Sequence, residues 1–118
     1  MSENSIKELP GSIGKLGKLK VLLMFKNVMS KLPDELGQCK SLEKCNVFNN
    51  KLIKLPASMT GLTELTELNV GGNKLKTLPQ TDAWTKLESF SCHRNSLIML
   101  PSFAGMAGLK FLKMVRTS

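Results

Sequence analysis

Apolar residues recur along this chain at fixed positions of a string that repeats every 22 or 23 residues. The strings start at Leu19, Leu42, Leu65, Leu87 and Leu109. Positions one, four and six are apolar in every string, and position nine of the first four is an asparagine: Asn27, Asn50, Asn73 and Asn95. Self-similarity at a period of roughly 20 to 29 residues is typical of solenoids whose units each contribute one strand and one return segment.

Positions four to six of each string predict a short strand. Neighbouring side chains of a strand point to opposite faces, so positions four and six share the face that is turned to the core. We expect inward side chains at Leu22 and Met24, Cys45 and Val47, Leu68 and Val70, Phe90 and Cys92, and Leu112 and Met114. The residues between them are expected to face solvent on the concave side of the solenoid.

The segment after each strand predicts how the chain turns back. An asparagine amide both donates and accepts hydrogen bonds, so the aligned asparagines are expected to form a ladder that satisfies backbone groups at the bend. A Leu-Pro step follows and ends strand pairing, because proline has no amide hydrogen. The return segments are expected to re-enter the core at Met29, Leu36, Cys39, Leu52, Met59, Leu62, Leu75, Leu97, Phe103 and Met106.

The pattern resembles the signature LxxLxLxxNxLxxLPxxLxxLxx of the leucine-rich repeat family. Within that family, the segments NSIKELPGSIGKLGKL and NVMSKLPDELGQCKSL resemble the intracellular Ras-group type. The resemblance implies an α/β fold, namely a right-handed solenoid with a concave parallel β-sheet and short helical or irregular convex segments. It also implies a scaffold without catalysis that takes part in intracellular signalling.

The repeat boundaries predict a single domain over residues 1–118. It comprises a half repeat 1–18, full repeats 19–41, 42–64, 65–86 and 87–108, and a partial repeat 109–118. Neither end shows a polar cap, and open strand edges and apolar faces invite pairing with another chain. We therefore expect either a segment of a longer solenoid or self-association through uncapped ends.

Composition narrows the cellular setting. The hydrophobic fraction of 42% is ordinary for a folded core, and no apolar run approaches the length of a transmembrane segment. The segment Met1–Pro10 lacks the basic start and apolar middle of a secretion signal, and the chain has no Asn-x-Ser/Thr glycosylation site. These features favour a cytoplasmic location.

The three cysteines, Cys39, Cys45 and Cys92, occupy positions where the pattern places leucine. Cys45 and Cys92 are predicted to lie two strands apart, roughly 9 to 10 Å by strand spacing, which is too far for a disulfide. His93 adjoins Cys92, but adjacent residues of a strand point to opposite faces. With one histidine and no clustered carboxylates, the sequence predicts no metal site and no cofactor, and it predicts buried thiols.

No arrangement of catalytic residues is recognisable in the sequence. No serine has a suitable histidine and acid partner, and the pair Gly71-Gly72 ends a strand and does not start a phosphate-binding loop. The sequence therefore predicts that the chain is not an enzyme.

Residues at the same solvent-facing position of successive strings are predicted to line up as columns on the concave side, and these columns supply the candidate binding residues. The aromatic column comprises Phe25, Phe48, Gly71, His93 and Val115. Phe25 and Phe48 are expected to anchor a protein partner, while a basic end around His93 and Arg94 sets its orientation. The two phenylalanines would alternatively stack on each other and contribute only to stability. The full candidate set is Val21, Leu23, Phe25, Lys26, Asn46, Phe48, Asn69, His93, Arg94, Lys113 and Arg116.

Charge supplies an alternative function. The net charge is +8, and lysines recur in the loops after successive strands to form a basic ridge: Lys7, Lys31, Lys51, Lys54, Lys74 and Lys76. Such a ridge would suit anionic partners such as acidic proteins, lipid head groups or nucleic acid. The ridge contains no aromatic residue on which a base would stack, so nucleic acid is not the expected partner. A third alternative is a structural fragment that only self-associates.

Overall fold

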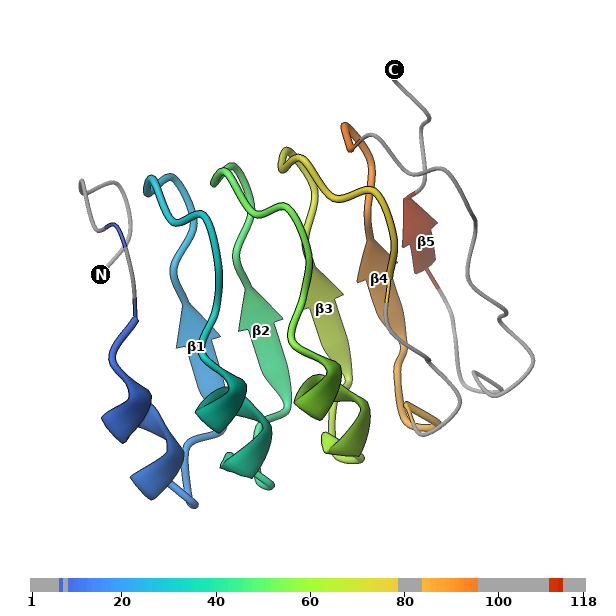
Figure 1. Cartoon of the computed structure of the whole chain (residues 1–118). Coiled ribbons are helices and arrows are strands. Elements are labelled where there is room, and N and C mark those ends of the chain that lie inside the picture. Colours follow the sequence, from blue (N-terminus) through green and yellow to red (C-terminus); the bar gives the residue numbers. More distant parts are fainter. Residues whose placement is uncertain (1–6, 8, 79–83, 96–110, 114–118) are drawn as a thin grey trace.

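The computed structural model is a stack of similar turns that places one parallel sheet on one side and short helices on the other (Figure 1). It describes residues 7, 9–78, 84–95 and 111–113, the last three by their backbone. The sheet has the order β1-β2-β3-β4-β5. Its strands are β1 (Val21–Leu23), β2 (Lys44–Asn46), β3 (Glu67–Asn69), β4 (Ser89–Ser91) and β5 (Phe111–Lys113).

The strand register matches the alignment of the repeats residue by residue. Every strand pairs in parallel with the next through the same position of the string. The central row is Leu22, Cys45, Leu68, Phe90 and Leu112. The columns predicted at positions three and five of the strings are therefore rows of paired residues in the sheet.

The core lies between the sheet and the return segments, as the pattern predicts. Positions four and six of the first four strings are all buried, and so are Met29, Leu36, Cys39, Leu52, Met59, Leu62 and Leu75. Trp84 is also fully buried, and its indole Nε1 donates a 2.9 Å hydrogen bond to the carbonyl of Met59. The side chains of Leu97, Phe103, Met106, Leu112 and Met114 lie outside the described residues.

The predicted asparagine ladder is present, and Asn50, Asn73 and Asn95 each join two turns. Asn50 Oδ1 accepts from the backbone N–H of Met29 at 3.2 Å. Its Nδ2 donates to the carbonyl of Val47 in its own turn and to that of Met24 in the preceding turn, both at 2.9 Å. Asn73 and Asn95 repeat this arrangement. The ladder therefore satisfies the backbone groups that the bend leaves unpaired.

Within the described residues, three 3-10 helices lie on the convex side: η1 (Gly11–Lys15), η2 (Asp34–Gln38) and η3 (Ala57–Gly61). Each begins directly after the proline of a Leu-Pro step. Successive helices stack closely, because a Cβ on Gly37 would lie 2.5 Å from Ser58 of the next turn. None of the helices in the described part has the length and apolar character needed to cross a bilayer.

Candidate protein-binding surface

The concave face carries exposed apolar side chains at one end and small polar side chains in the middle. Val21 and Leu23 on β1 are 46% and 47% exposed. The row that contains Leu23 continues across the sheet as Asn46, Asn69 and Ser91, and the row that contains Val21 continues as Lys44, Glu67 and Ser89. Apolar and hydrogen-bonding groups therefore stand side by side on one surface.

A shallow hollow of about 160 Å³ lies where these two rows cross the sheet. The Lys44 ammonium and the Glu67 carboxylate form an exposed ion pair of 3.8 Å beside it. The hollow, hereafter the concave hollow, is lined by Leu23, Lys44, Cys45, Asn46, Glu67, Leu68, Asn69, Ser89 and Ser91. It places three of the predicted binding residues, Leu23, Asn46 and Asn69, in one site.

The amide oxygens of Asn46 and Asn69 are held by the backbone. Asn46 Oδ1 accepts from the N–H of Phe48 at 3.0 Å, and Asn69 Oδ1 accepts from the N–H of Gly71 at 3.0 Å. Because an amide carries its acceptor and its donors on different atoms, these bonds fix which end of each side chain faces the hollow.

The aromatic column differs from the expectation. His93 was expected to face solvent, but it is only 8% exposed. Phe48 stacks on the His93 imidazole with the ring centroids 5.8 Å apart and the planes inclined by 28°. The contact passes over Gly71, where a Cβ would lie 2.7 Å from His93 Cε1. Phe48 is therefore half-buried against the imidazole, and within the described residues it makes no ring contact with Phe25.

The predicted basic end is only partly described. Lys26 and Arg94 are exposed and adopt the left-handed backbone conformation, each with φ of 57°. The same turn position holds Asn49 with φ of 60° and Gly72 with φ of 68°. The side chains of Lys113 and Arg116 lie outside the described residues.

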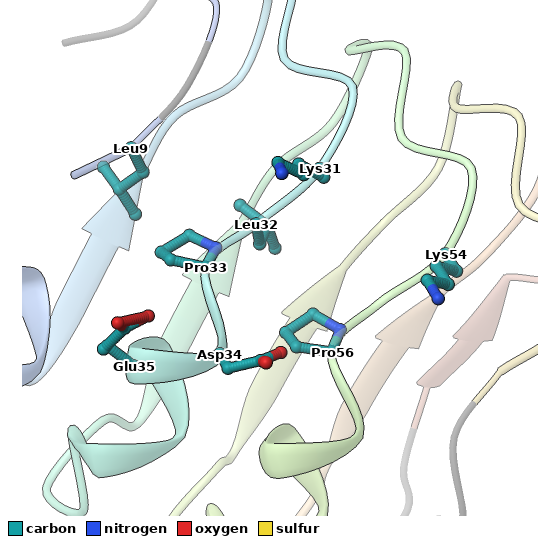
Figure 2. A pocket seen from close by; sticks show the side chains of 8 residues that line it. All are labelled: Leu9, Lys31, Leu32, Pro33, Asp34, Glu35, Lys54 and Pro56. Carbon is teal, nitrogen blue, oxygen red and sulfur yellow. The ribbon is translucent and has the colours of Figure 1, made fainter. Parts of the chain in front are cut away.

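All six lysines of the basic ridge, Lys7, Lys31, Lys51, Lys54, Lys74 and Lys76, are exposed. Lys31 and Lys54 stand over a hollow of about 440 Å³ on the convex side, which is also lined by Leu9, Leu32, Pro33, Asp34, Glu35 and Pro56. Figure 2 shows the two lysines along one side of this convex hollow and the carboxylates of Asp34 and Glu35 along the other. These carboxylates reduce the attraction of this part of the ridge for an anion.

The cysteines are buried and are not joined by disulfides. Burial raises the pKa of the Cys45 thiol to about 12 and that of the Cys92 thiol to about 11, because a thiolate is poorly solvated in the core. The pKa of Cys39 is raised for the same reason, and its Sγ donates to the carbonyl of Ile13 at 3.2 Å. Within the part that the structure describes, no three His, Cys, Asp or Glu side chains gather in a way that would hold a metal ion.

Sequence reasoning missed the concave hollow, the left-handed turn position and the Phe48–His93 contact. Two features of the sequence pointed to the aromatic contact and to the left-handed turn position. Gly71 leaves a gap in the aromatic column, and Asn49 and Gly72 are the residue types that tolerate positive φ.

Comparisons with known proteins identify the architecture. No protein-family model matches the sequence, and no curated protein matches it. Solved structures do match. A chain of the Toll–Spatzle complex of Drosophila aligns with 93% of this chain at 24% identity and a TM-score of 0.67.

Two further solved structures agree with the first. The plant peptide hormone receptor RGFR1 in complex with RGF2 aligns with 98% of this chain at 24% identity and a TM-score of 0.68. A leucine-rich repeat protein of Leptospira interrogans aligns with 95% at 23% identity and a TM-score of 0.51. This chain spans 19%, 23% and 41% of the Drosophila, plant and Leptospira chains. The fold is therefore an α/β leucine-rich repeat solenoid.

Proposed function

We propose that this chain is a non-catalytic protein-interaction module that binds its partner on the concave face. The observation that carries the proposal is the combination of exposed Val21 and Leu23 with the adjoining concave hollow. The solved structures with the same fold include a peptide hormone receptor in complex with RGF2, which is consistent with a binding role.

Energetics favour the apolar end of the sheet as the anchor. Fully burying a Val or Leu side chain contributes about 1.5 to 3 kcal/mol. An exposed ion pair such as Lys44–Glu67 contributes about 0 to 1 kcal/mol. Val21 and Leu23 are therefore expected to supply most of the affinity, and the polar residues beside them are expected to supply orientation.

The proposal extends to an intracellular signalling scaffold of the Ras-group type in the cytoplasm. The phrase LPGSIGKL from Leu9 to Leu16 supports the subtype by resemblance. The buried thiols Cys39, Cys45 and Cys92 suit a reducing compartment, in which disulfides are rare.

The test compares one double and one single side-chain truncation at exposed sites. Tagged wild-type protein, Val21→Ser/Leu23→Ser and Ile53→Ser are used for quantitative affinity capture from cells that produce the protein. Ile53 is a matched control, because it is 55% exposed and lies outside the concave strands. We expect the Ile53 variant to retain the wild-type partners and the double variant to lose them at least tenfold. Equal retention by the double variant rejects the concave face as the binding surface.

The lysine-ridge alternative predicts a different outcome. Binding through phosphate or carboxylate groups falls steeply as salt rises, whereas an apolar anchor persists. Lys31→Glu/Lys54→Glu would then abolish capture and Val21→Ser/Leu23→Ser would not. Self-association alone predicts a mass that grows with protein concentration in light scattering, without any other ligand.

A further inference from the structure

The concave hollow presents hydrogen-bond donors that the fold itself does not use. The amide oxygens of Asn46 and Asn69 each accept a hydrogen bond from a backbone N–H, with an N to Oδ1 distance of 3.0 Å in both. Within the described residues, no hydrogen bond uses the Nδ2 of either side chain, and both residues are half-buried and still accessible. Rotating either amide would place its NH₂ against a backbone N–H, so the donor orientation is fixed.

The two donors lie on neighbouring strands. Asn46 pairs with Asn69 in the β2–β3 register, and parallel strands stand about 4.8 Å apart. A hydrogen bond to oxygen is about 2.9 Å long. One group with two acceptor oxygens can therefore lie between the two amides and accept from both.

We propose that the concave hollow binds a carboxylate side chain of the protein partner on the amides of Asn46 and Asn69, with an apolar partner residue packed on Val21 and Leu23. The proposal rests on the function proposed above and specifies the partner: a segment in which an aspartate or glutamate lies close to an apolar residue. Leu23 pairs with Asn46 in the β1–β2 register, so the apolar contact lies one strand from Asn46 and two strands from Asn69.

Charge supports a carboxylate occupant. The chain has a net charge of +8, and Lys44 lines the same hollow. Glu67 lines the hollow as well, and its carboxylate lies 3.8 Å from the Lys44 ammonium, so these two local charges offset each other and the net charge of the chain decides the attraction. Hydrogen bonds to an ionised acceptor are also stronger than those to a neutral carbonyl, so the two amides favour a carboxylate.

Asparagine-to-aspartate substitution tests this directly because it keeps the shape of each side chain while it replaces the amide donors by a charged acceptor. Asn46→Asp/Asn69→Asp keeps an oxygen to accept from the N–H groups of Phe48 and Gly71, but it replaces both outward donors by acceptors. Asn49→Asp is the control, since Asn49 is exposed and does not line the hollow.

Random-peptide phage display on wild-type protein provides the probes. We expect enriched peptides to carry Asp or Glu near an apolar residue and to bind Asn46→Asp/Asn69→Asp at least tenfold more weakly. Changing the acidic residue of such a peptide to Lys should restore its binding to the double aspartate variant. Asn49→Asp should bind like wild type.

Each contrary outcome has its own meaning. If peptides that require Val21 and Leu23 bind the double aspartate variant as tightly as wild type, the amide donors are idle and this inference fails, while the proposed function stands. If the peptides require Asn46 and Asn69 but contain no acidic residue, the carboxylate occupant is wrong. If no enriched peptide depends on either pair, the inference and the proposed function both fail.

Discussion

The ring of Phe48 stacks on the imidazole of His93 although β3 lies between the strands that precede them. The side chains meet because the intervening turn position is Gly71, which leaves no Cβ between them. The stack fixes one edge of the concave face. Phe48 thereby contributes to the stability of the solenoid as well as to the surface that a partner would meet.

Gly71→Ala should destabilise the protein by about 1 to 3 kcal/mol, as overpacking usually does. The new Cβ would lie 2.7 Å from His93 Cε1 and would push the imidazole away from Phe48. Gly17→Ala is the control, because a Cβ there meets nothing within 4 Å. The midpoint of urea denaturation is measured for both variants and for the wild-type protein. An unchanged midpoint for Gly71→Ala would show that the imidazole is not held in this position.

Arg94→Asn should stabilise the protein by about 0.5 to 1 kcal/mol. Arg94 has φ of 57°, where a long side chain is strained and asparagine is tolerated. Another repeat has an asparagine, Asn49, at the equivalent position with φ of 60°. Lys51→Asn is the control, since Lys51 does not have positive φ. Thermal unfolding should show a higher midpoint for Arg94→Asn alone, and equal midpoints would contradict the strain argument.

Two asparagines four positions apart, Asn46 and Asn50, should differ sharply when replaced by alanine. Asn50→Ala removes three buried hydrogen bonds and leaves the N–H of Met29 without its partner, whereas the carbonyls of Met24 and Val47 keep the bonds from Asn27 and Asn73. We therefore expect a loss of about 2 to 3 kcal/mol. Asn46→Ala removes one half-buried bond to Phe48 N–H, and we expect about 1 kcal/mol. Denaturant unfolding compares the two. Equal losses would mean that the ladder is not the element that joins the turns.

The thiols should be unreactive in the folded protein. The raised pKa values of Cys45 (about 12) and Cys92 (about 11) leave almost no thiolate at pH 8, and both side chains are buried. An aromatic disulfide reagent at pH 8 should titrate these thiols only after denaturant is added. Rapid reaction without denaturant would contradict the burial.

The same pKa shifts predict a fall in stability at high pH. The folded pKa values lie above the ordinary value of 9.0, so the stabilisation is complete below pH 9 and is lost as pH rises from 9 towards 12. Cys45→Ala should show a smaller fall across this window than wild type, measured as the urea midpoint against pH. An identical fall would mean that Cys45 does not titrate differently on folding.

The core and the ladder were predictable from the sequence because the environment of each of these residues depends only on its own position in the repeat. Leu22, Cys45, Leu68 and Phe90 face inward through strand alternation alone, and Asn50 or Asn73 bonds to its own and the preceding turn whatever the neighbouring side chains are. The burial of His93 was not predictable in this way, because it depends on Gly71 and Phe48 in two other turns. The concave hollow likewise depends on the relative sizes of side chains across four strands.

The measurement that most directly tests the binding account is an amide NMR titration of the labelled chain with a partner that wild-type protein captures. The side-chain NH₂ signals of Asn46 and Asn69 report on the concave hollow, and the backbone signals of Lys31 and Lys54 report on the convex side. The account predicts that the Asn46 and Asn69 signals shift while those of Lys31 and Lys54 stay unchanged. Shifts confined to Lys31, Lys54 and their neighbours would contradict it.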